Sequence, residues 1–357
     1  MWRRKQKRSS NLLFVTFRMI LSLTMFALLF GGGYYAFRYF SGVDPLKISP
    51  QTAFLSTVAT NKDVSQLLDK LISQLNLPKI SLSQHTQIQG TNTDRAPSQN
   101  IGTNQAKSPV PKPITLFKFA LVTDSHNEND YLSRALAQAK KAGANFVIGL
   151  GDYTDTGTVD ELKIAKNSFD TAGLRYYLTA GDHDLWDSRN RSVPAVTNFS
   201  GFFGSPFQSF SSQGVKFIIV YNADNYDGLN KDQFDWLKTT FEQMQKVGSA
   251  SNAPDKLTLV FTDEPLYHPV SDHMMGKVNP KLLTQAKDLI KMFKENGVAE
   301  VFAGDIHFFS QYADPDSGLK MTTVGAVTSQ RNVQNPRFAM VTIYSDYSYS
   351  VDDIEIK

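Results

Sequence analysis

Acidic side chains follow the ends of successive apolar runs throughout residues 114–357, and this arrangement constrains the fold more than any other feature of the chain. Runs of strand length alternate with amphipathic stretches of helical period, and strands dominate from residue 319 on, which predicts a layered α/β fold. Five predicted strands are each followed within three residues by an aspartate, and three of these aspartates precede a histidine. The motifs are DSH at 124–126, GDYTD at 151–155, GDHD at 181–184, DEP at 263–265 and GDIH at 304–307.

These motifs are expected to meet in space, because ligands of open α/β sheets bind at the carboxyl ends of strands. Carboxylates and imidazoles gathered there make a metal site. A helix N-cap explains any one of the aspartates taken alone, but not five in series with histidine partners. The preceding strands are predicted at 117–123, 146–150, 176–179, 257–261 and 300–303, with a further strand at 216–221. Helices are predicted at 131–142, 159–172, 232–247 and 280–296.

The order of these motifs resembles that of the calcineurin-like metallophosphoesterase superfamily, over about residues 114–345. The family pattern runs D-x-H, G-D-x-x, G-N-H-[E/D], a histidine after a strand, and G-H-x-H. The resemblance implies a four-layer α/β/β/α sandwich of two mixed sheets, with two metal ions at the strand ends. The segments FFGSPFQSF and KDQFDWLKTTF, around the central strand, are also similar to the family.

The resemblance also implies the metal ligands, position by position. The first metal would be held by Asp124, His126, Asp152 and His307, all of which match the family pattern. The second would share Asp152 and add three positions at which this chain departs from the family: Asp182 replaces an asparagine, and Asp263 and Asp305 each replace a histidine. Carboxylates favour hard cations, and imidazole suits zinc and iron. We therefore expect Mn, Zn or Fe at the first site, and Ca, Mg or Mn at the second, which alternatively stays empty.

The substitutions change the charge that a phosphate ester would meet. Two divalent ions facing two carboxylates leave a positive site, whereas the same ions facing five aspartates leave a slightly negative one. Such a site binds phosphate more weakly unless cations such as Arg189 or Arg331 compensate for the excess negative charge. The alternative, which we favour, is that both are ordinary surface arginines. His268 and His273, downstream of the altered motif, are either replacement ligands or, as we favour, solvated loop residues.

His183 stands where the family carries the histidine that protonates the leaving group, and Asp155 or Asp184 is expected to orient it. The alternative interpretation of His183 is a buried histidine with satisfied hydrogen bonds. The loops at 186–207 and 270–277 are expected to set substrate specificity, since function in such folds varies through loops.

The first forty residues indicate a membrane anchor. A basic tail at 1–18 precedes the uncharged segment 19–37, which is long enough to span a bilayer as a helix. The positive-inside rule places the tail in the cytoplasm and the main domain outside. A cleaved signal peptide and a buried core helix are the alternatives. Residues 38–113 read as a stalk or linker with a short helix near 63–75, and residues 114–357 as the metallophosphoesterase domain.

Taken together, these observations predict a membrane-anchored, extracytoplasmic, metal-dependent phosphoesterase that hydrolyses phosphomonoesters or phosphodiesters with metal-activated water. The alternative is a catalytically impaired family member that binds a metal or another ligand, and a weaker one is a metal-free structural module. The chain has no cysteine, which excludes thiol catalysis and cysteine-ligated metal sites. Its formal charge of +3 comes from the basic tail, so no nucleic-acid-binding surface is expected, and no partner protein is evident.

Overall fold

A computed structural model of the chain describes residues 113–250 and 255–357. The predicted tail at 1–18, the membrane helix at 19–37, the linker up to residue 112 and its helix near 63–75 all lie outside the described residues. Among the residues that are described, no helix combines the length and apolar character needed to cross a bilayer.

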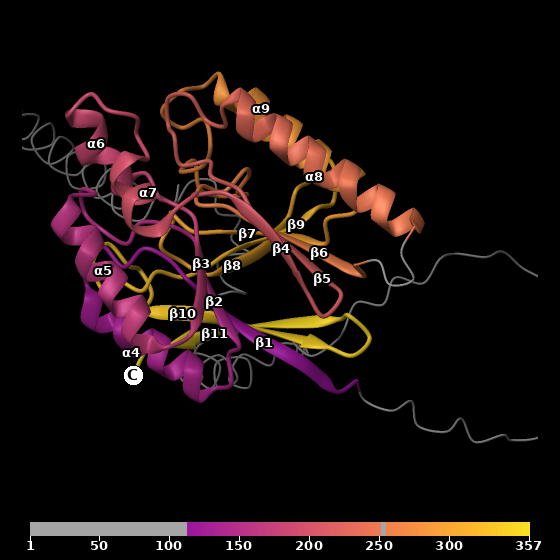
Figure 1. The fold of residues 1–357 in the computed structure, drawn as a ribbon, viewed down its shortest axis with the longest axis horizontal. Helices are drawn as coiled ribbons and strands as arrows, with labels where there is room; N and C mark the ends of the chain where they lie inside the picture. The colour runs from indigo at the N-terminus through magenta and orange to yellow at the C-terminus, as the bar shows by residue number, and fades with distance from the viewer. Residues whose placement is uncertain (1–112, 251–254) are drawn as a thin grey trace, which may run out of the picture. The chain divides into compact units, whose positions relative to one another are not determined.

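Two mixed β-sheets form the centre of the domain, as predicted (Figure 1). The first has the strand order β11-β10-β1-β2-β3, in which β1, β2 and β3 run parallel and β10 and β11 pair antiparallel. Its strands are β1 (Thr115–Val122), β2 (Phe146–Gly149), β3 (Arg175–Leu178), β10 (Arg337–Tyr344) and β11 (Tyr349–Glu355). Because β1 to β3 run in one direction, the loops that follow them leave the sheet at the same edge.

The second sheet has the order β4-β5-β6-β7-β9-β8, with β5, β6, β7 and β9 parallel. Its strands are β4 (Gln208–Ser212), β5 (Val215–Ile219), β6 (Leu257–Phe261), β7 (Glu300–Ala303), β8 (Ser310–Ala313) and β9 (Lys320–Thr323). The edge strands β4 and β8 are antiparallel to their neighbours. The loops after β6 and β7, which carry the DEP and GDIH motifs, therefore also leave at one edge.

The helices begin and end where local sequence favours it. In α5, Thr158 accepts a hydrogen bond from the Glu161 amide while the Glu161 side chain bonds back, which is a capping box, and Gly173 ends the helix in the left-handed region. The helices are α4 (Asn129–Lys141), α5 (Val159–Ala172), α6 (Trp186–Asn190), α7 (Thr197–Phe203), α8 (Lys231–Ala250) and α9 (Leu282–Glu295), with a 3₁₀ turn η1 (His183–Leu185).

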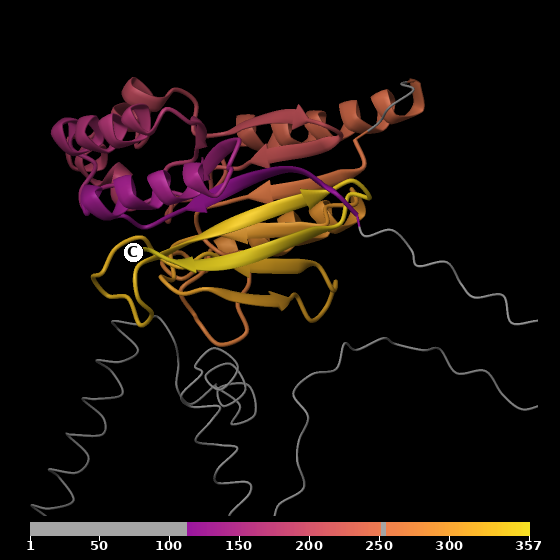
Figure 2. The same cartoon turned by 90° about the horizontal axis from the view of Figure 1, so that it is seen from below.

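Strand alternation sends side chains to separate cores on the two faces of each sheet. In β1, Phe119 and Leu121 face the second sheet, whereas Ala120 and Val122 pack with α4 and α5. Phenylalanines dominate the layer between the sheets, where Phe119 and Phe146 stack with ring centroids 5.3 Å apart. A third core joins the second sheet to α8 and α9. Figures 1 and 2 show α4 and α5 beside the first sheet and α8 and α9 beside the second.

The predicted elements agree with the observed ones to within a few residues where the periodicity is strong. The helix predicted at 159–172 has those bounds, and strand 216–221 is observed as Val215–Ile219. The short α6 and α7 and the strand β8 were not predicted, since four to seven residues give too few repeats for a period to be recognised.

Candidate metal centre

The five predicted motifs converge at the carboxyl ends of β1, β2, β3, β6 and β7. Asp124 and His126 follow β1, and Asp152 follows β2, in the first sheet. Asp305 and His307 follow β7 in the second sheet, and the Asp305 amide donates to Asp124 Oδ2 at 3.2 Å. This bond joins the ends of the two sheets, so side chains 181 residues apart in the sequence lie in one cluster.

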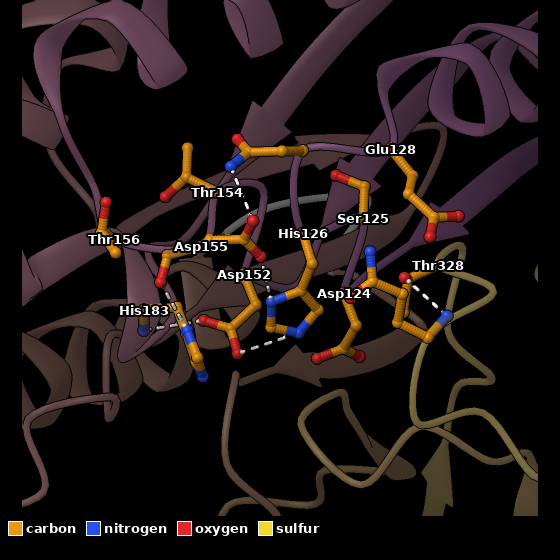
Figure 3. A network of polar contacts seen from close by, with 12 residues as sticks. Asp124, Ser125, His126, Glu128, Asp152, Thr154, Asp155, Thr156, His183 and Thr328 are labelled. Atoms are coloured by element: carbon orange, nitrogen blue, oxygen red, sulfur yellow. Dashed lines mark hydrogen bonds and ion pairs between the residues drawn. The ribbon is translucent and has the colours of Figure 1, made fainter.

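One group of side chains brings two imidazoles and a carboxylate together. Ligand atoms of Asp124, His126 and His307 all lie within 4.8 Å of one another. The Nε2 atoms of His126 and His307 are 3.1 Å apart, and His307 Nε2 lies 3.6 Å from Asp124 Oδ1. The fourth expected member, Asp152, places Oδ2 3.8 Å from His126 Nε2 (Figure 3). The nitrogen and oxygen atoms that a cation needs therefore already face one point.

A second group consists of carboxylates alone. Oxygens of Asp152, Asp182 and Asp305 lie within 4.8 Å of one another, and Asp152 links this group to the first, because its carboxylate also lies within 4.8 Å of ring nitrogens of His126 and His183. The remaining expected ligand, Asp263, lies outside that group. It is nevertheless close to it, because its Oδ1 packs against Gly151, the residue before Asp152, at a point only 2.1 Å from where a Cβ would stand. Asn225 donates from Nδ2 to Asp182 Oδ2 at 2.7 Å and fixes the direction of that side chain.

The chain backbone is strained at the candidate ligands. Asp124, His126, Asp152, Asp305 and His307 all have φ between +42° and +68°, the left-handed region that costs roughly 1 kcal/mol or more for a residue with a Cβ. Such strain persists only where surrounding contacts hold it, and it clusters at functional sites. Glycine beside these residues lets two loops approach each other closely. A Cβ at position 181 would be 2.1 Å from Asp152 Oδ1, so a larger residue would collide with that carboxylate.

Burial opposes ionisation of these acids. Asp124, Asp152 and Asp263 are at most 1% exposed, and loss of hydration raises the pKa of each well above its usual range. The pKa of Asp305 is raised by burial and then by the charge of Asp182. Burial also lowers the pKa of His126 and of His307, so both imidazoles are neutral at pH 7 and present lone pairs.

Several of these buried atoms have no hydrogen-bond partner within the described part of the chain. They are Asp124 Oδ1, Asp305 Oδ2, Glu264 Oε2 and both carboxylate oxygens of Asp263. Burying a polar group without a partner is costly, and burying several acids together is more so. A divalent cation removes both penalties at once, so the residues present fit a metal centre, and its oxygen-rich half fits a hard ion.

Asp155 orients two histidines through different atoms. Its main-chain carbonyl accepts a hydrogen bond from His183 Nδ1 at 2.7 Å, and its carboxylate Oδ1 lies 3.6 Å from His126 Nδ1. The expected contact with His183 therefore exists, but through the backbone. The same carboxylate leaves His126 Nε2 directed at the cluster, which is how acids commonly support metal-binding histidines. Proximity to His126 also lowers the pKa of Asp155.

Asp184, the other residue expected to orient His183, does something else. It is fully buried, and its carboxylate accepts hydrogen bonds from the amides of Tyr153, Thr154 and Gly181 and from the Thr154 hydroxyl. It therefore ties the loop after β2 to the loop after β3. His183 contacts Trp186 instead, with ring centroids 4.1 Å apart, and donates its amide to Asp152 Oδ1.

His268 is a buried loop anchor, which corrects the expectation of a solvated residue. Its Nδ1 accepts from the Ser271 amide at 2.9 Å and its Nε2 contacts Ser310 Oγ at 3.0 Å, while burial lowers its pKa to about 4. Both nitrogens are thus used away from the cluster. His273 is closer to the expected alternative, since its Nδ1 lies 3.8 Å from Asp305 Oδ2 and it remains partly exposed.

The two arginines considered as compensating cations differ. Arg189 forms an ion pair with Asp224 at 3.2 Å, so its charge is already matched. Arg331 is exposed, on the loop between β9 and β10, in the left-handed region at φ 50°. That loop is bonded to the cluster by the Thr328 amide, which donates to the Asp124 carbonyl at 2.9 Å. Burial raises the pKa of Asp124 and Asp305, and the charge of Arg331 opposes part of that rise.

Three polar residues of the site were missed in the sequence. Glu264 is 3% exposed beside Asp263, and burial raises its pKa. Asn222 accepts from the amides of residues 263 and 264 and donates to the Glu264 carbonyl, which fixes the loop after β6. Asn222 and Asn225 both belong to the NADN segment after β5. Polar side chains that follow an apolar strand are the signal that identified the aspartates, and the same signal marks these two asparagines.

Comparison with known proteins agrees with this geometry. The family model described as calcineurin-like phosphoesterase matches residues 117–309, more than half of the chain. The chain therefore belongs to the calcineurin-like phosphoesterase family, as its motifs predicted.

Individual relatives are distant. A probable glycerophosphodiester phosphodiesterase from Arcobacter nitrofigilis is 25% identical over 136 residues, which are 38% of this chain and 46% of that protein. The match thus spans less than half of that relative. Among solved structures, a dimetal phosphatase from Danio rerio is similar with a TM-score of 0.48 and 15% identity, covering 68% of this chain and 99% of that one. A purple acid phosphatase from yellow lupin is similar with a TM-score of 0.47 and 11% identity, covering 70% of this chain and 53% of that one.

Proposed function

We propose that the protein is a divalent-metal-dependent phosphoesterase that hydrolyses phosphomonoesters or phosphodiesters. The observation that carries the proposal is the convergence of six predicted ligands from both sheets into two groups of three. Ligand atoms within each group lie within 4.8 Å of one another, and Asp152 of the second group is equally close to His126 of the first. Several oxygens of this cluster are buried without a partner, which a cation would supply. Family membership supports the same class of reaction.

Each half of the cluster suits a different ion. Asp124, His126, Asp152 and His307 would hold the first ion, for which Mn, Zn or Fe fits the mixed nitrogen and oxygen donors. Asp152, Asp182, Asp263 and Asp305 would hold the second, for which Ca, Mg or Mn fits the carboxylates. Bound divalent ions supply Lewis acidity toward phosphoryl oxygens and lower the pKa of water.

His183 is proposed as the proton donor to the leaving oxygen. Its Nδ1 donates to the Asp155 carbonyl, so the neutral ring has a bare Nε2, and the ring must be doubly protonated to release a proton there. The carbonyl stabilises that imidazolium, and the Trp186 ring holds its plane. Arg331 is proposed to attract the phosphate anion to a cluster that is otherwise rich in acids.

A second candidate function rests on the same acids. With Glu264 added to the five aspartates, the cluster holds six carboxyls, and two divalent ions would leave it net negative if all were ionised. Under this alternative the site binds a metal without turning over phosphate esters. The triple change Asp182→Asn, Asp263→His and Asp305→His would then create hydrolysis that the natural chain lacks.

We also propose that residues 19–37 anchor the protein in a membrane with the catalytic domain outside the cytoplasm. The support is the uncharged segment itself and the basic tail before it. Protease protection of the two termini in intact cells tests this topology independently of the chemistry.

Hydrolysis of p-nitrophenyl phosphate and bis(p-nitrophenyl) phosphate by the full chain with Mn²⁺ tests the reaction. We expect turnover that is lost on adding EDTA and in the double variant His126→Ala, Asp152→Ala. Asp316→Ala, which alters an exposed acid on the β8–β9 turn, serves as the matched control. Equal rates in the double variant and the native chain would refute the proposal.

A further inference from the structure

Two aromatic side chains stand at the surface beside the proposed proton donor. Trp186 is 39% exposed and Tyr226 is 61% exposed, both unusually high for large rings in a described domain whose other rings are mostly in the core. Trp186 belongs to α6, directly after β3 and η1, and Tyr226 belongs to the loop between β5 and α8. Exposed aromatics that line a site commonly bind the apolar part of a ligand.

Contacts hold both rings near the metal cluster. Trp186 stacks on His183 with an interplanar angle of 27°, and the His183 amide bonds to Asp152. Tyr226 directly follows Asn225, which donates to Asp182 of the second carboxylate group. Trp186 is therefore linked to Asp152 through His183, and Tyr226 is linked to Asp182 through Asn225.

Arg189 links the two segments that carry the rings. It lies three positions after Trp186 on α6, so the two side chains share a helix face. Its guanidinium lies 5.4 Å from the centre of the Tyr226 ring and pairs with Asp224 at 3.2 Å. The cation–π contact and the ion pair hold the Tyr226 loop against α6, so the two segments that carry the exposed rings lie together. We refer to Trp186 and Tyr226 as the aromatic rim.

We propose that the aromatic rim is the subsite for the leaving group, and that it selects phosphate esters whose leaving group carries a planar aromatic ring. The inference rests on the proposed function, because a proton donor marks the side on which the leaving oxygen departs. Any substituent on that oxygen must extend past His183. Two rings contact His183: His126, which is assigned to the first metal, and Trp186, which stacks on it and is free of that role. Planar rings stack on tryptophan and tyrosine faces, whereas small alkyl groups gain much less.

Binding of three phosphonates to the Mn²⁺-loaded full chain separates this inference from catalysis, because phosphonates have no leaving oxygen. Isothermal titration calorimetry is expected to show phenylphosphonate binding about tenfold more tightly than methylphosphonate. Cyclohexylphosphonate, which is apolar but not planar, should lie between them. The preference should disappear in Trp186→Ala and be retained in Trp186→Phe, which keeps a ring that can stack.

Tyr226→Ala should reduce the preference by several-fold, and the control Ile164→Ala, an equally exposed apolar residue on α5, should leave it unchanged. Equal affinities for the phenyl and methyl compounds in the native chain would overturn the aromatic rim alone. If neither compound binds the metal-loaded chain, the phosphate site is wrong and the proposed function fails with it. A preference that survives Trp186→Ala and Tyr226→Ala together would place the aromatic subsite elsewhere and also overturn the inference.

Discussion

Replacing Asp305 by asparagine should stabilise the metal-free protein but not the metal-loaded protein. Asp305 is 7% exposed, its Oδ2 accepts no hydrogen bond from the described residues, and oxygens of Asp152 and Asp182 lie within 4.8 Å. Two full charges at 4.8 Å repel by roughly 3.5 kcal/mol at an effective dielectric of about 20. Asparagine keeps the shape and one oxygen but removes the charge.

The realised effect is smaller than the pairwise figure, because burial raises the pKa of Asp152 and of Asp305, which reduces the charge they carry together. We expect Asp305→Asn to stabilise the metal-free chain by about 1–2 kcal/mol, which raises Tm by roughly 2–4 °C per kcal/mol for a domain of this size. In saturating Ca²⁺ the gain should vanish, since a tenfold loss of affinity removes about 1.4 kcal/mol of the stabilisation by bound metal.

Scanning calorimetry of the full chain in EDTA and in Ca²⁺ measures both effects, with Asp316→Asn as the exposed control. A lower Tm for Asp305→Asn in EDTA would show that the carboxylate is satisfied without a cation. An unchanged Ca²⁺ increment would show that position 305 does not contact the ion. Either result would refute the reasoning.

Three further predictions follow from other parts of the domain. Burial raises the pKa of Asp124, Asp152 and Asp263, so above about pH 4 the folded chain binds more protons than the unfolded chain. The Tm measured in EDTA should therefore fall from pH 5 to pH 8. Bound Mn²⁺ should remove that fall. Arg331→Gln should lower kcat/KM for phosphate esters roughly tenfold, and the loss should shrink at high salt. If kcat/KM of the variant and of the native chain depended equally on salt, Arg331 would be excluded from the site. Tyr349→Phe removes the 2.6 Å bond that its hydroxyl donates to buried Glu300 and should cost about 1–3 kcal/mol in chemical unfolding while leaving kcat unchanged.

The strand-end motifs predicted which side chains come together, because the physics is local. Each motif immediately follows an apolar strand, and parallel neighbours bring their ends to one edge regardless of what the intervening loops do. Asp124, His126, Asp152 and His307 were therefore found without knowledge of any contact. The alternation of apolar runs predicted a layered α/β fold, and the resemblance of the motifs to the calcineurin-like family implied the two mixed sheets that are observed.

Side-chain partners were predicted less well because they depend on geometry that spacing does not encode. Asp184 was expected to orient His183, yet its carboxylate binds three backbone amides, and Asp155 reaches His183 through its carbonyl. The burial of His268 depends on a hydrogen bond to Ser310, 42 residues later. Such contacts are decided by how loops pack once the sheets have formed, which a pattern of residue types does not contain.

The central claim is that turns from both sheets share a divalent cation, and metal quantification tests it most directly. The full chain, loaded with Mn²⁺ and passed through a desalting column, should retain tightly bound ion in stoichiometric amount. The double variant His126→Ala, Asp152→Ala should retain none. A native chain that holds no more divalent metal than this variant would contradict the account, however well the two proteins fold.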